Sequence, residues 1–140
     1  MELMLQRNAL DLGIVTANET AMLGFYRDTL GLPEEPPATI PGLGTIHKLK
    51  CGESLIKMLV PTRLPASAAR DASPDPMRFA ATAGFRYFCL TISNLRPVLA
   101  RCKSAGCVVL VEAAEIRPGV VAAMLEDPDG NAVELMQLGT

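Results

Sequence analysis

The chain contains one order of predicted elements twice, and this repeat limits its possible folds more than any other feature. An apolar strand pattern, residues 10–16, precedes a helical pattern in residues 18–31, and the same two patterns return in residues 85–92 and 94–106. Both helical patterns begin at asparagine and end at glycine, and they have nearly the same length. The closing glycine fits a left-handed C-terminal cap. The chain is therefore two copies of one structural unit.

Three strand patterns follow each helix, so each copy has the order βαβββ. They cover residues 34–38, 45–51 and 54–60 in the first copy, and residues 108–112, 120–126 and 132–137 in the second. One such sheet would leave an apolar face bare, so we expect the two sheets to curl toward each other or to pair with those of a second chain. The predicted fold class is α+β, with two βαβββ modules forming an open curved sheet. Such a cup is a shape that holds ligands.

Length and composition agree with a single domain over residues 1–140. A chain of 140 residues is near the commonest domain size, and its 49% hydrophobic content is enough for a substantial core. We assign module one to residues 9–61 and module two to residues 84–138, with bounds good to a few residues. A linker rich in proline, alanine and serine, residues 62–83, separates the modules.

The charge pattern favours a small partner molecule. The 13 basic and 15 acidic residues give a formal net charge of -2 without a run of like charge, so neither nucleic acid nor an anionic membrane is an expected partner. A membrane span would need about 18 uninterrupted apolar residues, and the sequence has no such stretch. The N-terminus lacks the basic segment and apolar run of a secretory signal. We expect a cytoplasmic location.

The four cysteines support the same location. Cys51, Cys89, Cys102 and Cys107 contain no CxxC pair, which argues against a zinc knuckle or a thioredoxin-type motif. We interpret them as reduced and mostly buried thiols. Cys51 and Cys89 lie in apolar strand patterns, where cysteine behaves as a small hydrophobic residue.

A predicted hairpin near the C-terminus carries one carboxylate, Glu134, in an apolar strand pattern. The turn, Asp127-Pro128-Asp129-Gly130, joins a strand that ends at Glu126 to a strand that begins at Ala132. Alternation along the second strand places Val133 on one face and Glu134 on the other. Glu134 is thereby delivered to an otherwise apolar surface.

Three segments together resemble one known family. The hairpin of residues 124–135, the helix end Phe-Tyr-Arg-Asp-Thr-Leu-Gly-Leu at residues 25–32 and the strand at residues 52–61 are similar to motifs of the vicinal oxygen chelate superfamily. That superfamily includes glyoxalase I, methylmalonyl-CoA epimerase, extradiol dioxygenases, fosfomycin-resistance enzymes and bleomycin-binding proteins. The three segments span nearly the whole chain in the family's order. The resemblance implies a glyoxalase-like cup, in a homodimer or in a monomer that closes its own cup.

The resemblance also implies where a site would lie. In this family each module supplies two metal ligands, one from its first strand and one from its last. The matching positions are Asp11, Lys57, Tyr87 and Glu134. The internal repeat supports this alignment, because Lys57 follows Asp11 by 46 positions and Glu134 follows Tyr87 by 47.

The residues at these positions depart from the family's ligand set, which is His or Gln, then Glu, Gln or His, then His, then Glu. Only Glu134 survives. Lys57 carries an ammonium group, which has three donors and no acceptor and repels a divalent cation. Tyr87 would have to lose its phenolic proton to bind a metal. His47, the only histidine, lies in a strand pattern, and we interpret it as a surface or hydrogen-bonded residue. We expect neither a metal nor another cofactor.

The four polar positions allow two interpretations if they converge. In the first, Lys57 pairs with Asp11 and Glu134, Tyr87 caps the group, and the former metal position becomes a structural salt bridge. In the second, Lys57 stabilises an enolate, a carboxylate takes the α-proton and Tyr87 donates to the oxygen, as in a metal-free lyase or isomerase. Lysine between two carboxylates would, however, keep them poorly basic.

Two classes of function therefore stay open. One is a small glyoxalase-like enzyme that acts on an apolar or carbonyl-containing metabolite. The other is a non-catalytic protein of the bleomycin-resistance type that sequesters a drug or metabolite. A metal-dependent lyase or dioxygenase with an unusual ligand set, built on Asp11, Glu134 and either His47 or Tyr87, is a further alternative. The 4% aromatic content and the absence of tryptophan favour a small ligand over a large drug.

The linker carries three arginines, Arg63, Arg70 and Arg78. They are candidates to close over an anionic ligand, although linker arginines are more often solvated.

Overall fold

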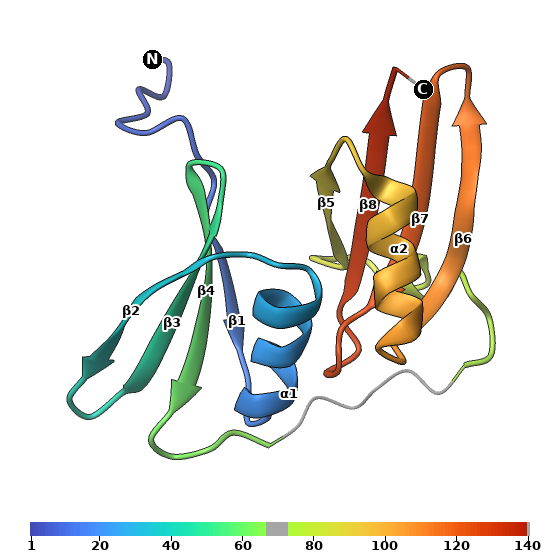
Figure 1. Ribbon diagram of the computed structural model, residues 1–140. Coiled ribbons are helices and arrows are strands. Elements are labelled where there is room, and N and C mark those ends of the chain that lie inside the picture. Colours follow the sequence, from blue (N-terminus) through green and yellow to red (C-terminus); the bar gives the residue numbers. More distant parts are fainter. Residues whose placement is uncertain (67–72, 140) are drawn as a thin grey trace. The chain divides into compact units, whose positions relative to one another are not determined.

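The computed structural model describes residues 1–66 and 73–139. These residues form two compact units, one before and one after the gap. Each unit consists of a four-stranded sheet and a helical segment (Figure 1). The predicted α+β class with two βαβββ modules is confirmed.

The first unit follows the predicted order of elements. They are β1 (Leu12–Val15), α1 (Glu19–Leu23), η1 (Gly24–Thr29), β2 (Glu34–Ile40), β3 (Gly44–Cys51) and β4 (Ser54–Pro61). The strand order in the sheet is β1-β4-β3-β2, with β1 parallel to β4 and the other neighbours antiparallel. The parallel pair exists because the helical segment carries the chain across the sheet, from β1 at one edge to β2 at the other.

The helical segment of the first unit changes type along its length. After one turn of α-helix the chain continues as the π-helical segment η1, in which the Leu30 N–H donates to the carbonyl of Phe25 at 2.9 Å. Phe25 and Tyr26 are buried and belong to the core. Gly31 follows with φ of 81°, in the left-handed region predicted from the sequence.

Strand β2 extends further than the proline-rich pattern predicts. It runs to Ile40 and pairs with β3, but its register shifts between Glu35 and Ala38, where Pro36 and Pro37 lie. Proline removes a ladder donor and is tolerated at a bulge or on an edge strand, and β2 has both features.

The second unit repeats the order. Its elements are η2 (Arg78–Ala80), β5 (Tyr87–Thr91), α2 (Leu95–Ser104), β6 (Val108–Arg117), β7 (Val120–Glu126) and β8 (Ala132–Leu138). The strand order is β5-β8-β7-β6, with β5 parallel to β8. Helix α2 lies across one face of this sheet and packs against β6, β7 and β8 (Figure 1). Its buried residues are Leu95, Val98, Leu99 and Cys102.

The predicted hairpin between β7 and β8 is confirmed. Glu126 pairs with Ala132, and the intervening turn is organised by Asp127, whose exposed fraction is 1%. The Asp127 carboxylate accepts the backbone N–H groups of Asp129 at 3.0 Å and Asn131 at 2.9 Å. A carboxylate that satisfies its own turn in this way fixes the register of both strands.

Strand β6 reaches Arg117 and is longer than predicted. The sequence pattern missed its end, because register shifts along the pairing with β7 break the simple alternation that marks a strand.

Among the described residues, no helix is long and apolar enough to cross a membrane.

Candidate functional site

The face of the first sheet that carries Lys57, here called the Lys57 face, points away from α1. Lys57 pairs with Gly13 on β1 and with Lys48 on β3, so these three residues share the face. His47, the residue before Lys48 on β3, points to the opposite face and reaches Glu19 of α1. The Lys57 face is therefore free of the unit's own helix.

Asp11 and Lys57 come together on this face, as the sequence predicts. The Lys57 ammonium lies 3.5 Å from Oδ2 of Asp11. Asp11 also accepts the Arg7 guanidinium at 2.6 Å through Oδ2 and the Leu55 backbone N–H at 2.8 Å through Oδ1. The Arg7 contact was not predictable from sequence patterns, because the N-terminal residues match no motif.

These contacts hold Asp11 as a carboxylate. The backbone hydrogen bond from Leu55 and the interactions with Arg7 and Lys57 lower the pKa of Asp11, although desolvation opposes them. Lys57, with 47% of its side chain exposed, keeps donors directed to solvent. The ammonium group of Lys57 is therefore half-exposed to solvent and ion-paired with the Asp11 carboxylate.

This half of the site does not suit a divalent metal. The Asp11 carboxylate already accepts a backbone N–H and a guanidinium. The second residue at the family's metal position, Lys57, carries an ammonium group. Two cations beside one carboxylate leave no net negative charge to attract a third. Within residues 1–66 and 73–139, no group of three or more His, Cys, Asp or Glu side chains is arranged to hold a metal ion.

The second unit presents a corresponding face, the Glu134 face, formed by Tyr87, Cys89 and Glu134. Strands β5 and β8 pair in register, with Tyr87 opposite Ala132 and Cys89 opposite Glu134. On the other face of β8, Gln137 accepts the N–H of Leu95 at the start of α2. The Glu134 face therefore points away from α2.

Cys89 is the direct neighbour of Glu134, and sequence reasoning missed it. The expectation that Cys89 is buried is wrong, because the residue is exposed on this face. Partial desolvation of the thiol and its hydrogen bond to Glu134 raise the pKa of Cys89 to about 11. The thiol consequently stays protonated and donates to the carboxylate. Strand alternation places Cys89 on the face of Tyr87, two residues earlier, but it does not say whether that face is covered.

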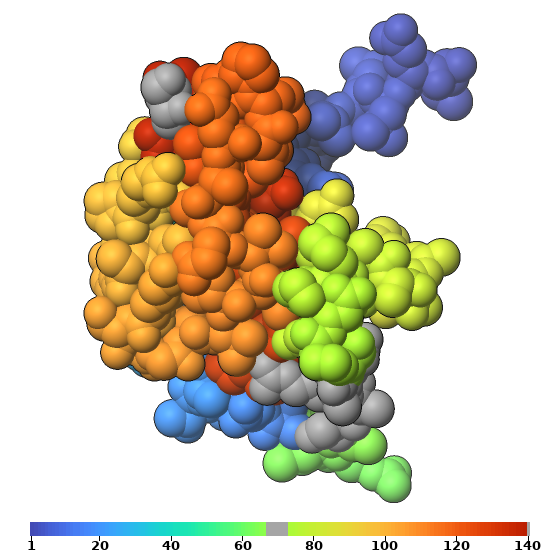
Figure 2. All heavy atoms as spheres, turned by 90° about the vertical axis from the view of Figure 1, so that its right-hand side faces the viewer, coloured from blue at the N-terminus to red at the C-terminus, as the bar shows by residue number. Residues whose placement is uncertain are grey.

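A short segment before β5 covers part of the second sheet. We call residues 73–80 the linker strap. Its Phe79 packs against Leu110, Met124 and Ala132, and its ring meets that of Tyr87 edge to face at a centroid distance of 5.7 Å. Figure 2 shows the yellow-green atoms of this part of the chain against the orange atoms of the sheet.

A buried ion pair holds the linker strap in place. The Arg78 guanidinium lies 2.7 Å from Oε1 of Glu126, with 15% and 4% of the two side chains exposed. Arg78 also donates to the backbone carbonyls of Ser73 and Asp75. Arg78 is therefore a structural anchor rather than a solvated arginine, whereas Arg70 lies outside the described residues.

His47 is buried on the face opposite Lys57. Its Nδ1 lies 2.7 Å from a carboxylate oxygen of Glu34 and its Nε2 lies 2.9 Å from one of Glu19. The interpretation of His47 as a hydrogen-bonded residue is confirmed. The contact with His47, followed by that with Arg27, lowers the pKa of Glu34. The histidine thus joins α1, β2 and β3.

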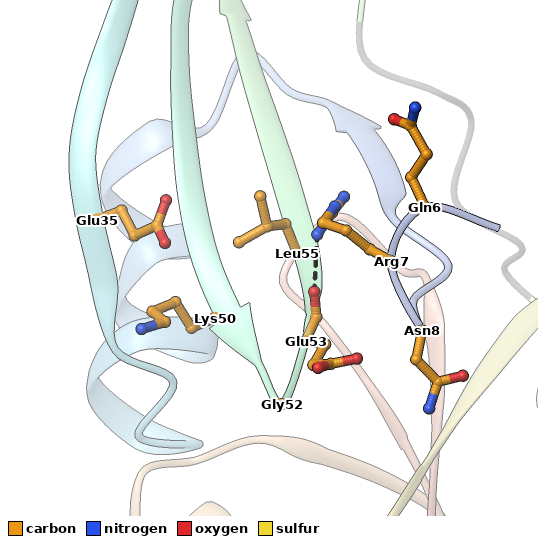
Figure 3. Close-up of a pocket in the computed structure, with 8 residues that line it drawn as sticks. All are labelled: Gln6, Arg7, Asn8, Glu35, Lys50, Gly52, Glu53 and Leu55. Carbon is orange, nitrogen blue, oxygen red and sulfur yellow. Dashed lines mark hydrogen bonds between the residues drawn. The ribbon is translucent and has the colours of Figure 1, made fainter.

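A hollow of about 390 Å³ lies beside the β3–β4 turn (Figure 3). Its lining residues are Gln6, Arg7, Asn8, Glu35, Lys50, Gly52, Glu53 and Leu55. Arg7 crosses it to donate to the backbone carbonyl of Glu53 at 2.9 Å. Since its walls carry two basic and two acidic side chains, the hollow favours no net ligand charge, and neither Asp11 nor Lys57 lines it.

Comparison with known proteins identifies a family that agrees with the observed fold. The family model described as Glyoxalase/Bleomycin resistance protein/Dioxygenase superfamily matches residues 10–135. No curated protein matches the sequence.

Solved structures share the fold at low sequence identity. A glyoxalase family protein from Bacillus anthracis is 21% identical, with a TM-score of 0.64 and 99% of both chains covered. An antibiotic binding protein from Streptomyces sp. CB03234 is 17% identical, with a TM-score of 0.68 over 97% of this chain and 99% of that one. The trypanothione-dependent glyoxalase I of Leishmania major is 14% identical, with a TM-score of 0.70 over 94% and 87%.

Proposed function

Because this chain belongs to the Glyoxalase/Bleomycin resistance protein/Dioxygenase superfamily, we propose that it binds a small apolar or carbonyl-containing metabolite and that Lys57, instead of a metal ion, meets the oxygen of that molecule. The observation that carries the proposal is the pair of Lys57 and Asp11 at 3.5 Å on the Lys57 face. A half-exposed ammonium braced by a carboxylate donates to a carbonyl oxygen as a metal would polarise it.

The second unit offers its own candidate ligand groups, Tyr87 and Glu134. Tyr87 is exposed and supplies both a hydroxyl donor and an aromatic surface next to Phe79. Phe79 covers Met124 and Ala132, so the rings of Tyr87 and Phe79 supply the apolar surface that suits the hydrocarbon part of a metabolite.

Catalysis is the second candidate, and the contacts of the two carboxylates differ in how well they suit a base. Asp11 is a poor base, because its contacts lower its pKa. Glu134 accepts a thiol hydrogen bond and has no arginine or lysine among its described ion pairs, so it is the candidate base of the second unit. In the first unit, Lys57 would stabilise the enolate of a carbonyl compound, as in a lyase or isomerase.

Sequestration without turnover is the corresponding non-enzymatic function. The antibiotic binding protein from Streptomyces sp. CB03234 supports it as a protein of the same fold. Both versions require the ligand contact of Lys57, so that contact is tested first.

The test compares two probes, acetophenone and ethylbenzene, which have a carbonyl group and a methylene group at the same position. Each is titrated into the labelled protein and followed in NMR spectra. We expect the protein to prefer acetophenone by at least about tenfold, since a charge-assisted hydrogen bond contributes roughly 1.5–3 kcal/mol. Lys57→Met should lose this preference. Lys103→Met is the matched control, because Lys103 is also 47% exposed and ion-paired, and it lies at the end of α2. Retention of the preference in Lys57→Met would refute the proposal.

A further inference from the structure

Helix α2 ends in a two-bond pattern that depends on Gly106. The N–H of Cys107 donates to the carbonyl of Cys102 at 3.0 Å, and the N–H of Gly106 donates to the carbonyl of Lys103 at 3.0 Å. Gly106 has φ of 79°. These bonds define the Schellman motif, which commonly brings the side chains at its two outer positions into contact.

In this chain both outer positions are cysteines. The contact that normally joins two apolar side chains here joins two thiols, which lie within hydrogen-bonding reach of each other. Cys102 is buried, Cys107 is partly exposed, and both are free. The backbone hydrogen bond keeps the two residues close, as a disulfide requires, since its Cα atoms lie about 4.4–6.8 Å apart.

We propose that Cys102 and Cys107 form a dithiol site that low-molecular-weight disulfides oxidise to an intramolecular disulfide. Cys107, the accessible member, loses its proton and attacks one sulfur of the oxidant, which breaks the oxidant's S–S bond and releases one thiol. Cys102 then loses its proton and attacks the Cys107 sulfur, which displaces the second thiol. The two protein thiols lose two electrons and two protons, and the oxidant gains them.

The environment makes this exchange slow at neutral pH. Burial raises the pKa of Cys107 and raises that of Cys102 to about 11, so the reactive thiolate is scarce. The rate should rise with pH. The new bond would clamp the end of α2 against the start of β6. Since α2 lies on the sheet face opposite Glu134, the modification is independent of the proposed ligand contacts.

Trypsin makes the pair easy to identify. Cleavage after arginine and lysine, except before proline, puts Cys51, Cys89, Cys102 and Cys107 on four different peptides, residues 51–57, 87–101, 102–103 and 104–140. The protein is incubated with oxidised glutathione at pH 8.5, remaining thiols are alkylated in denaturant, and the digest is analysed by mass spectrometry. We expect residues 102–103 linked to residues 104–140 as the main disulfide.

Two variants make the result decisive. Cys89→Ser should keep the cross-link, and Cys107→Ser, which leaves the buried Cys102 untouched, should abolish it. The proposal is wrong if the wild-type protein gives only glutathione adducts, a link that involves Cys51 or Cys89, or a link between two chains. A cross-link that forms no faster at pH 8.5 than at pH 7 would contradict the proposed thiolate attack.

Discussion

At the scale of single residues, the site depends on which atoms surround each carboxylate. Asp11 accepts a backbone N–H, a guanidinium and an ammonium group, whereas Glu134 accepts a thiol. The first arrangement lowers the pKa of Asp11 and keeps it ionised, whereas Glu134 has no cation among its described contacts. The two acidic residues of the predicted site therefore have different surroundings, which their sequence positions alone do not reveal.

Glu34 gives a prediction about stability and pH. Its pKa is lowered, first by the hydrogen bond with His47, so its contribution is present above its usual pKa of 4.5 and is lost as the pH falls through the lower folded value. Glu34→Gln should destabilise the protein by about 1–2 kcal/mol at pH 7. The difference from wild type should shrink below pH 4.5.

Urea unfolding at pH 7 and at pH 3.5 measures this effect. Glu112→Gln serves as the control, because its ion pair with Lys103 is exposed and should contribute little. An equal loss of stability in Glu34→Gln at both pH values would show that the carboxylate charge is not the cause.

At the scale of elements, the linker strap contributes an interaction that sequence patterns do not predict. Arg78→Leu should leave the buried Glu126 carboxylate without its guanidinium and destabilise the second unit by about 3 kcal/mol. Arg78→Leu combined with Glu126→Leu should recover much of that loss, because no buried charge remains. Thermal unfolding of the two variants decides the matter: a double variant no more stable than Arg78→Leu would contradict this account of the pair.

The elements themselves were largely predictable, and the exceptions have physical causes. Alternating apolar residues and the turn at Asp127 predicted β7 and β8 almost to the residue. The extension of β6 was missed because bulges break the alternation, and the exposure of Cys89 was missed because an apolar strand pattern does not say which face is covered. The linker strap was missed because its contacts join residues about 48 positions apart, as Arg78 and Glu126 do.

At the scale of the whole molecule, we propose that the protein acts as a homodimer, as the family resemblance implies. Sedimentation velocity at micromolar concentration should give a species of twice the 14.9 kDa chain mass. Ionic strength should change this result little, because the formal net charge of -2 gives no strong repulsion to screen. A single species of chain mass across the concentration range would support a monomer that closes its own cup.

The central claim is that Lys57 and its partners replace the metal of this family. The most direct measurement is elemental analysis by plasma mass spectrometry on protein purified without chelators or an affinity tag, reported as moles of metal per chain. Our account predicts transition metal well below one equivalent, because Asp11 is already bound by donors and Lys57 repels a cation. One equivalent of a transition metal per chain would contradict it.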